Sequence, residues 1–380
     1  MKSIILTKGV LVTGANALNY LENIHCRKAV LVTGGQSMAR TGVLGRVKEI
    51  LEKKGIQVCI YKGICKNPDD VQIMEGTGYL RREKPDGVIA VGGGSAIDAA
   101  KAMVLFYDYP ELNFENVFSA DLSDKPLKTL LAAVPSTSGT ASEVTHVTVV
   151  TLSDLHIKQA IRSEYLRPEI AILDPDLPMS LPASIAAETG MDALTHAIEA
   201  YINKNGNDFT DVLAKGAIEG LIRWLPVSCH TGTRESREHV HNYSAMAGMA
   251  FSNSGLGMVH GVSHAFGGMY NLPHGLANAV ILPYAMDYNK KDSQVKEKFD
   301  ILSKTVGQDI IQAVKGLKTD LGIAFRLMDT GIAESDFLSD YEELVDHSLQ
   351  GSTAVNPIPV SREDMEYFVR CVFYGEPVDF

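Results

Sequence analysis

The sequence predicts an α/β domain followed by an all-helical domain. Between residues 28 and 135, apolar runs rich in β-branched residues alternate with segments of helical periodicity, and several of these runs end in glycine. From about residue 185 onward such runs become scarce and helical periodicity dominates. Alternation of this kind is typical of βαβ units, in which helices cover a mainly parallel sheet. We therefore expect an α/β domain at 1–182 and a helical domain at 183–380.

The periodicity assigns the elements in order. In the first domain, strands are expected at 28–35, at 56–64, at 86–95 and at the start of 127–145. Helices are expected between them at 41–55, 70–85 and 96–106. In the second domain we expect helices at 184–203, 207–224, 236–265, 292–305, 308–321 and 361–372.

Composition restricts the class of protein. The chain has 380 residues, of which 45% are hydrophobic and 21% charged, so it can bury a large core and fits two domains. Its formal net charge is −11 and it contains no basic block, so we expect no nucleic-acid partner. No run approaches the ~20 apolar residues that cross a bilayer, so we expect no membrane partner either.

Cysteine usage and the first residues indicate the compartment. The five cysteines are scattered and form no CxxC pair, which favours reduced thiols over a disulfide framework or a thiolate metal site. The first residues, MKSIILTKGVLVTG, are interrupted by Lys8 and do not have the pattern of a signal peptide. We therefore expect a soluble, cytoplasmic protein.

A glycine-rich turn in DGVIAVGGGSAIDAAKAM is the first candidate binding site. An apolar strand leads into Gly92, Gly93 and Gly94, and Ser95 follows where a helix begins. Glycines let a ligand approach the backbone, Ser95 can cap the helix, and free amides at a helix start attract anions. A P-loop would end in GK[ST], which is absent here, so nucleotide hydrolysis is not favoured. The alternative is a plain strand–helix turn with glycine for packing.

A hydroxyl-rich loop, PSTSGTASEVT at 135–145, is the second candidate. Its serines and threonines can donate to phosphate or ribose oxygens, although it could also be a polar surface turn. Ligands of open α/β sheets bind at the carboxyl ends of the strands, where both loops are expected. Together they indicate a dinucleotide site.

The first expected βα turn, LVTGGQSMARTG at 31–42, bears on which dinucleotide is bound. It lacks the GxGxxG fingerprint and has no acidic residue to hold a ribose 2′-hydroxyl. Gly34, Gly35 and Ser37 leave room for a 2′-phosphate, with Arg40 nearby. The turn is therefore compatible with NADP as well as NAD.

Two helical pairs suggest a metal site. Asp192 and His196 are four residues apart in ETGMDALTHAIEAYI and would share one helix face, as would His260 and His264 in GMVHGVSHAFGG. The alternatives are a capping or salt-bridged pair and satisfied core histidines.

A fourth histidine, His274, follows Pro273, and Gly267 and Gly268 are expected to end the helix before it. Imidazoles with one carboxylate suit Fe(II) or Zn(II) rather than Mg²⁺ or Ca²⁺. Five candidates exceed four ligands, so one histidine is expected outside the coordination shell.

Several motifs together resemble the iron-containing (group III) alcohol dehydrogenases. They are GGGSAIDAAK, PSTSGTASEVT, MDALTHAIEAYI, FSNSGLGMVHGVSHAFGG and YNLPHGLANAVILPYAMDYN, in the family's order and spacing. The resemblance implies a dehydroquinate synthase-like fold, with a Rossmann-like α/β N-terminal domain and an all-α C-terminal domain, and a homodimer. It implies Asp192, His196, His260 and His274 as metal ligands, and it makes His264 a candidate proton relay beside them.

The resemblance and the motifs together define the expected cofactor contacts. Asn67 in KNP and Lys158 in VTLSDLHIK match cofactor-lining positions of the family. NAD-preferring members often carry an aspartate where this chain has Gly34. Val149, Phe251 and His146 are also expected to shape the substrate pocket. The expected cofactor-binding residues are Gly34, Gly35, Ser37, Asn67, Gly92, Gly93, Gly94, Ser95, Asp98, Ser136, Thr137, Thr140, Val149 and Lys158.

These observations predict a metal-dependent, NAD(P)-linked dehydrogenase that interconverts a primary alcohol and its aldehyde. The metal, Fe(II) or Zn(II), would act as Lewis acid during hydride transfer. A polyol or glycerol dehydrogenase on the same fold is the nearest alternative. A lyase would need a Lys and Arg cluster near the histidine segments, which the sequence does not offer. A non-catalytic nucleotide- or metal-binding module is the alternative from another class.

Overall fold

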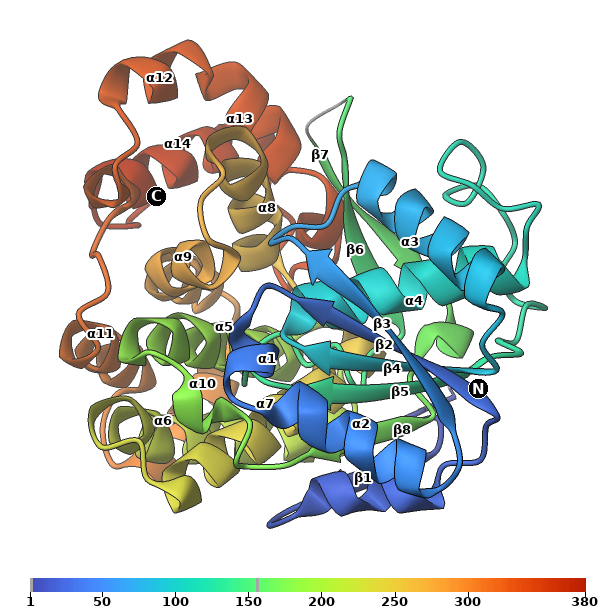
Figure 1. Cartoon of the computed structure of the whole chain (residues 1–380). Helices are drawn as coiled ribbons and strands as arrows, with labels where there is room; N and C mark the ends of the chain where they lie inside the picture. Colours follow the sequence, from blue (N-terminus) through green and yellow to red (C-terminus); the bar gives the residue numbers. More distant parts are fainter. Residues whose placement is uncertain (1–2, 155–156) are drawn as a thin grey trace. The chain divides into compact units, whose positions relative to one another are not determined.

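The chain forms two compact units, Met1–Leu181 and Pro182–Phe380 (Figure 1). The computed structural model describes residues 3–154 and 157–380. The first unit contains a parallel sheet with helices and the second is helical, so the predicted fold class is confirmed. Within the described residues, no helix has the length and apolar composition needed to cross a membrane.

A six-stranded sheet forms the centre of the first unit. Its strand order is β1-β8-β5-β4-β2-β3, and all of its registered pairs are parallel. A separate antiparallel hairpin consists of β6 (Val147–Leu152) and β7 (Ile157–Arg162). The strands of the sheet are β1 (Val10–Thr13), β2 (Lys28–Gly34), β3 (Gln57–Ile64), β4 (Gly87–Gly92), β5 (Leu130–Pro135) and β8 (Ile170–Leu173).

Both faces of this sheet are covered. Alternate residues of β2 and β4 point to opposite faces, and because both faces are buried, these strands are continuously apolar. Val30 and Val88 belong to the core with helices α3 (Asp70–Glu83) and α4 (Gly94–Asp108). Leu31 and Ile89 belong to the opposite core, with the 3-10 helix η1 (Ala17–Asn23) and α2 (Val43–Lys53). Figure 1 shows α3 and α4 along one face and α2 along the other.

The strand order reverses between β2 and β4. The chain passes from β2 outward to β3 and then returns to place β4 on the other side of β2. Such a switch point opens a crevice at the carboxyl ends of the strands, where α/β proteins bind ligands. The turns after β2, β4 and β5 all lie at this edge because the three strands are adjacent and parallel.

The second unit is built around one buried helix, α5, which packs against α6, α7 and α9. Every residue of α5 from Gly190 to Ile202 is buried, as expected for a helix surrounded by others. The helices are α5 (Ala183–Ile202), α6 (Asp208–His230), α7 (Arg234–Ser254), α8 (Met258–Tyr270), α9 (His274–Asn289), α10 (Ser293–Val306), α11 (Ile310–Asp320), α12 (Glu334–Ser339), α13 (Tyr341–Ser348) and α14 (Arg362–Tyr374).

Two expected helix boundaries were wrong. The single helix expected at 236–265 is divided into α7 and α8, because Gly255 has a φ of 98° and ends α7. Gly267 and Gly268 do not end the following helix, which continues to Tyr270 and stops at Asn271 in the left-handed conformation. Packing of the surrounding apolar residues, including fully buried Phe266, holds the helix through these glycines despite their weak propensity.

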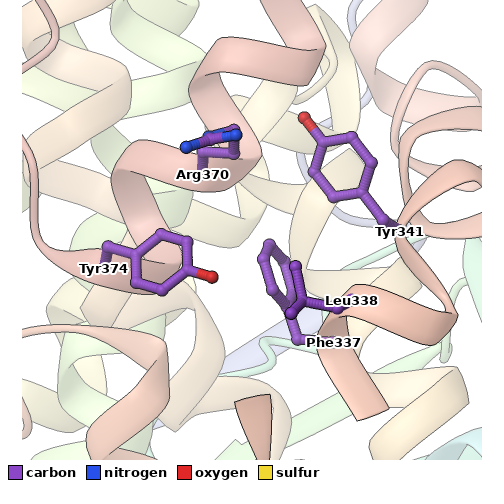
Figure 2. A pocket seen from close by; sticks show the side chains of 5 residues that line it. All are labelled: Phe337, Leu338, Tyr341, Arg370 and Tyr374. Atoms are coloured by element: carbon purple, nitrogen blue, oxygen red, sulfur yellow. The ribbon is translucent and has the colours of Figure 1, made fainter. Parts of the chain in front are cut away.

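Helix α9 was not predicted, although it carries His274. Helices α12 and α13 were not predicted either; the stacked rings of Phe337 and Phe373, 3.8 Å apart, join α12 to α14. A small pocket between these helices contains none of the expected site residues (Figure 2). It is lined by Phe337, Leu338, Tyr341, Arg370 and Tyr374.

Candidate functional site

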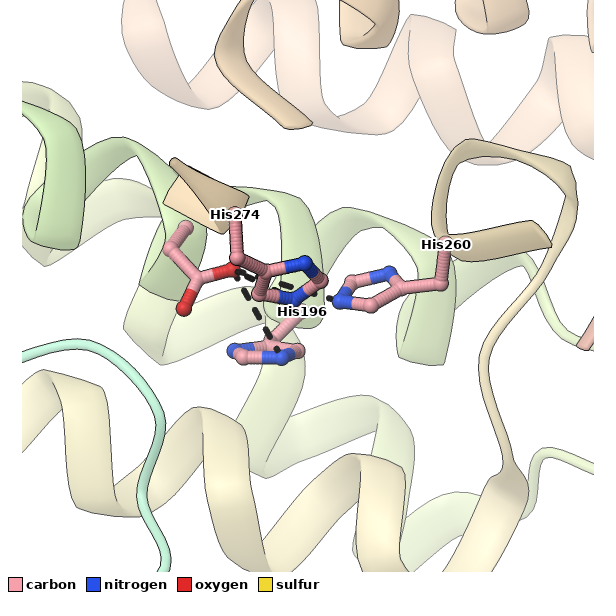
Figure 3. A group of neighbouring side chains, drawn as sticks. His196, His260 and His274 are labelled. Atoms are coloured by element: carbon pink, nitrogen blue, oxygen red, sulfur yellow. Dashed lines mark ion pairs between the residues drawn. The ribbon is translucent and has the colours of Figure 1, made fainter. Parts of the chain in front are cut away.

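Four side chains from three helices of the second unit converge in one place (Figure 3). Asp192 and His196 lie one turn apart on α5, while His260 lies on α8 and His274 is the first residue of α9. One potential ligand atom from each side chain lies within 4.8 Å of the others. The Oδ1 atom of Asp192 is 3.7 Å from Nε2 of His274, 3.8 Å from that of His196 and 4.0 Å from that of His260.

Burial makes this cluster suited to a cation. Asp192, His196 and His260 are buried, and only His274 retains appreciable exposure, 27% of its side chain. Burial holds the pKa of His260 well below its usual range, and the neighbouring histidines lower this pKa further. Neutral imidazole is the form that binds metals, so this environment suits His260 for coordination.

Glu199 anchors the helix that carries His260. This buried glutamate is on α5, two turns after Asp192, and its Oε2 lies 2.5 Å from Nδ1 of His260. Its Oε1 accepts a hydrogen bond of 2.7 Å from the backbone N–H of Val259 at the start of α8. Burial raises the pKa of Glu199 to about 8, and backbone N–H donors oppose this rise. A cation on the Nε2 side of His260 would favour the ionised carboxylate.

Asn278 reaches the centre of the cluster from α9. Its Nδ2 donates to Asp192 Oδ1 at 2.7 Å and lies 3.1 Å from Nε2 of both His260 and His274. A carboxylate oxygen can only accept, so this contact identifies the atom facing it as the amide nitrogen. Within the described chain, Asn278 Oδ1 is buried without a hydrogen-bond partner.

These observations fit a metal better than a structural polar cluster. Three imidazoles and a carboxylate each direct a potential metal-ligand atom at one point, and only one amide, that of Asn278, lies among them. Three imidazoles and one carboxylate are a typical donor set for iron or zinc, with no thiolate to change the preference. The donor atoms of the cluster are therefore suited to a divalent metal ion.

Two further side chains border the cluster. The ring of His264 stacks against His274 with centroids 5.1 Å apart, and lies 5.9 Å from the ring of His260. His264 is half-buried on α8. Phe251 of α7 stacks on His196 with centroids 4.4 Å apart, so an apolar surface adjoins the cluster.

In the first unit, the turns after β2, β4 and β5 are gathered at the switch point. The backbone N–H of Ser136 donates to Gly92 O at 2.9 Å. A Cβ placed on Gly94 would lie 2.5 Å from Oγ1 of Thr140, and one on Gly93 would lie 3.4 Å from Thr137. Glycine is required at position 94 because the hydroxyl-rich loop approaches so closely.

Ser95 does not cap α4. Gly93 occupies the cap position and no side chain accepts a hydrogen bond from the first turn, which leaves backbone amides available for an anion. At the end of β2, a Cβ on Gly34 would lie 2.8 Å from Ile64 O, so the strand pairing itself excludes an aspartate here. Gly35 has a φ of 49° with open space around it, and Ser37 begins the short helix α1 (Ser37–Arg40).

The remaining expected cofactor residues form two pairs in the same unit. Lys158 Nζ donates to Asn67 Oδ1 at 2.9 Å, which joins the β7 strand to the loop after β3. The backbone N–H of Val149 donates to Asp98 Oδ2 at 3.3 Å, whereas Asp98 Oδ1 has no hydrogen-bond partner in the described chain. Burial raises the pKa of Asp98, and Lys101 opposes this rise.

Glu199 and Asn278 were not predicted as site residues, although helical spacing carries a signal for both. Glu199 follows Asp192 by seven residues and His196 by three, so it shares their helix face. Asn278 follows His274 by four residues, but this relation needed α9, which was not predicted. A search for polar residues at helical spacing from each expected ligand would have found them.

Comparisons with known proteins show the family to which the chain belongs. Residues 9–175 match the family model for iron-containing alcohol dehydrogenase, and residues 186–372 match the C-terminal model of the Fe-containing alcohol dehydrogenase family. The chain is 37% identical over 379 residues to an NADPH-dependent butanol dehydrogenase from Clostridium saccharobutylicum, with 97% of each chain covered. A 1,3-propanediol dehydrogenase from Klebsiella pneumoniae is 38% identical over 325 residues, covering 82% of this chain and 83% of the relative.

A solved structure extends the comparison to the whole fold. The iron-containing alcohol dehydrogenase from Thermococcus thioreducens has a TM-score of 0.92 and 35% identity, covering 98% of this chain and 100% of the other. The protein belongs to the iron-containing alcohol dehydrogenase family. It is accordingly an alcohol oxidoreductase, metal-dependent and linked to a nicotinamide cofactor, and the resemblance described from its motifs is confirmed.

Proposed function

We propose that Asp192, His196, His260 and His274 hold Fe(II), or Zn(II), and that the enzyme interconverts small primary alcohols and their aldehydes. The single observation that supports this most strongly is the convergence of the four ligand atoms within 4.8 Å. When bound, the metal supplies Lewis acidity at the substrate oxygen and the nicotinamide supplies or accepts hydride.

The protein's own side chains have distinct roles in this proposal. Asn278 orients the Asp192 carboxylate through its 2.7 Å hydrogen bond. Phe251, stacked on His196, offers an apolar wall for the alkyl part of the alcohol. His264, half-buried beside two ligands, carries the alcohol proton away from the site, directly or through water. In the first unit, burial keeps His146 neutral by lowering its pKa to about 4, and His146 and Val149 are proposed to contribute to substrate selectivity.

We further propose that the enzyme uses NADP(H) readily. The glycine-rich and hydroxyl-rich turns at the switch point would bind the pyrophosphate and the adjoining ribose. The turn after β2 carries no carboxylate to repel a 2′-phosphate, and Gly35 is surrounded by open space. The name of the relative from Clostridium saccharobutylicum, an NADPH-dependent butanol dehydrogenase, supports the same preference.

A homodimer and a cytoplasmic location complete the proposal. The terminal strand of the sheet, β1, pairs with β8, and an edge strand offers backbone groups to a second chain. The five cysteines are free thiols in the described structure, as expected in a reducing compartment. Light scattering coupled to size-exclusion chromatography would give twice the 41.2 kDa chain mass for the dimer.

The substrate proposal is tested by steady-state assays at 340 nm on protein whose metal content has been measured. C2–C6 aldehydes are supplied with NADPH and NADH in parallel, and alcohols, glycerol and 1,3-propanediol with the oxidised cofactors. We expect butanal reduction with NADPH to exceed activity on glycerol. A preference for glycerol would favour a polyol dehydrogenase, and no turnover of any substrate by the metal-loaded protein would contradict the proposal.

A further inference from the structure

Glu199 is placed to determine which nitrogen of His260 faces the metal site. We propose that Glu199 is a positioning residue that fixes both the tautomer and the orientation of His260, an inference that rests on the proposed metal site. It makes no contact with the proposed metal position, so its action would pass through the imidazole.

A short hydrogen bond links His260 to Glu199. Nδ1 of His260 lies 2.5 Å from Glu199 Oε2, a distance at which one proton must lie between these atoms. When the carboxylate accepts this proton from Nδ1, the neutral ring has its lone pair on Nε2. That atom is directed toward Asp192 Oδ1, 4.0 Å away, and thus toward the proposed metal.

Glu199 also holds the start of the helix that carries His260. Glu199 Oε1 accepts from Val259 N–H at 2.7 Å, so one carboxylate holds both the side chain of His260 and the first turn of its helix. Asn356 assists from another segment, because its Oδ1 accepts from Met258 N–H at 3.2 Å. A Cβ at Gly257 would lie 2.9 Å from both the Glu199 and the Asn356 oxygens, so glycine is what lets the two acceptors approach.

Substitutions at Glu199 can distinguish a positioning role from a packing role. Glu199 is 3% exposed and lies among the buried polar groups of α5, so any substitution also changes packing. Glutamine keeps the size and can still accept from Val259, but its amide nitrogen would face Nδ1 of His260 and require the opposite tautomer. Aspartate is one methylene shorter, yet it remains a charged acceptor. If Glu199 acts by positioning His260, Glu199→Asp should bind the metal more tightly than Glu199→Gln. If Glu199 acts only by packing, Glu199→Gln should bind the metal more tightly.

The test is a titration of the metal-stripped full-length protein with Co²⁺, in competition with a chelator and followed by the visible absorption of the bound ion. We expect Glu199→Gln to weaken Co²⁺ binding by roughly 10- to 100-fold and to alter the absorption spectrum. Glu199→Asp should lose less affinity than Glu199→Gln. Asn356→Ala, which removes the other acceptor at the start of α8 without touching His260, is the matched control and should bind Co²⁺ within about threefold of the parent protein.

The inference is overturned if Glu199→Gln binds Co²⁺ like the parent, if it binds more tightly than Glu199→Asp, or if Asn356→Ala loses as much affinity. Should Glu199→Gln fail to fold, Glu199→Met, which has no acceptor for His260, takes its place, and Co²⁺ affinity and an absorption spectrum equal to those of the parent would then overturn the inference. A parent protein that binds no stoichiometric Co²⁺ would instead contradict the proposed metal site itself.

Discussion

The amide nitrogen of Asn278 donates a 2.7 Å hydrogen bond to the Oδ1 atom of Asp192, and the same nitrogen lies 3.1 Å from two histidine Nε2 atoms. The two residues come from α9 and α5, so this contact ties together two helices that carry proposed ligands. Since a carboxylate that is not held can rotate away from a metal, the position of Asp192 depends on its partner.

Replacing Asn278 by alanine should therefore weaken metal binding by about tenfold or more, because the Asp192 carboxylate loses its buried donor. Competition between the apoprotein and a zinc chelator measures this change. Asn289→Ala is the matched control, because Asn289 is a buried asparagine of the same helix that pairs with Asn356 instead of a ligand. Equal zinc affinity in Asn278→Ala and the parent would show that Asp192 needs no such support.

Replacing His264 by asparagine should lower kcat by about 100-fold while leaving the metal content unchanged, since His264 is proposed to move a proton and not to bind the ion. Steady-state kinetics over a range of pH, with metal analysis of the same sample, measures both effects. His239→Asn serves as control, because His239 stacks on Trp224 with centroids 4.1 Å apart and is not part of the cluster. Unchanged kcat, or loss of the metal, would assign His264 another role.

Replacing Gly35 by aspartate should shift the cofactor preference from NADPH toward NADH. Asp tolerates a positive φ better than most residues, and the space around Gly35 is open, so the fold should accept the change. The new carboxylate should reduce kcat/KM for NADPH by about tenfold more than for NADH, through repulsion of the 2′-phosphate. Gly35→Asn has a similar backbone preference without charge, and an equal shift in that variant would exclude the electrostatic explanation.

The buried His241 should make folding sensitive to acid. Burial lowers the pKa of His241 to about 4, whereas the pKa in an unfolded chain is about 6.5. The unfolded chain therefore binds more protons between these values, so the contribution of His241 to stability is complete above pH 6.5. It is lost as the pH falls toward 4, by roughly 3 kcal/mol.

Urea unfolding of the apoprotein at several pH values between 4.5 and 7 would detect this loss. In His241→Gln, the free energy of unfolding should depend less steeply on pH in that range, whatever its absolute value at neutral pH. The same pH slope in the variant and the parent would mean that His241 retains an ordinary pKa in the folded protein.

Much of the fold was predictable because its signals are local. The buried strands around Val30 and Val88 are continuous apolar runs in the sequence. Each of these runs is followed by a segment of helical periodicity that ends in glycine or a polar turn. Features that depend on contacts between distant parts of the chain were harder to predict from the sequence. The break at Gly255 lies inside a segment with helical periodicity, and only the packed structure reveals that a new helix starts at Met258.

In the candidate site, too, local spacing was predictable and contacts between helices were not. Asp192 and His196 could be paired by their spacing, whereas their proximity to His260 and His274 depends on how α5, α8 and α9 pack. Glu199 and Asn278 stand at helical spacing from expected ligands, but which atoms they hold is shown only by hydrogen bonds between helices. Residues that support a site in this way are specified by tertiary contacts more than by sequence pattern.

Asp192, His196, His260 and His274 are proposed to bind the metal on which turnover depends. His274 offers the cleanest test, because its side chain is 27% exposed and its loss should disturb the core least. The direct measurement is the amount of iron or zinc per chain in purified His274→Ala, taken together with its turnover of a primary alcohol. We predict that metal content and turnover both fall well below the parent values; full occupancy with full turnover would contradict the assignment.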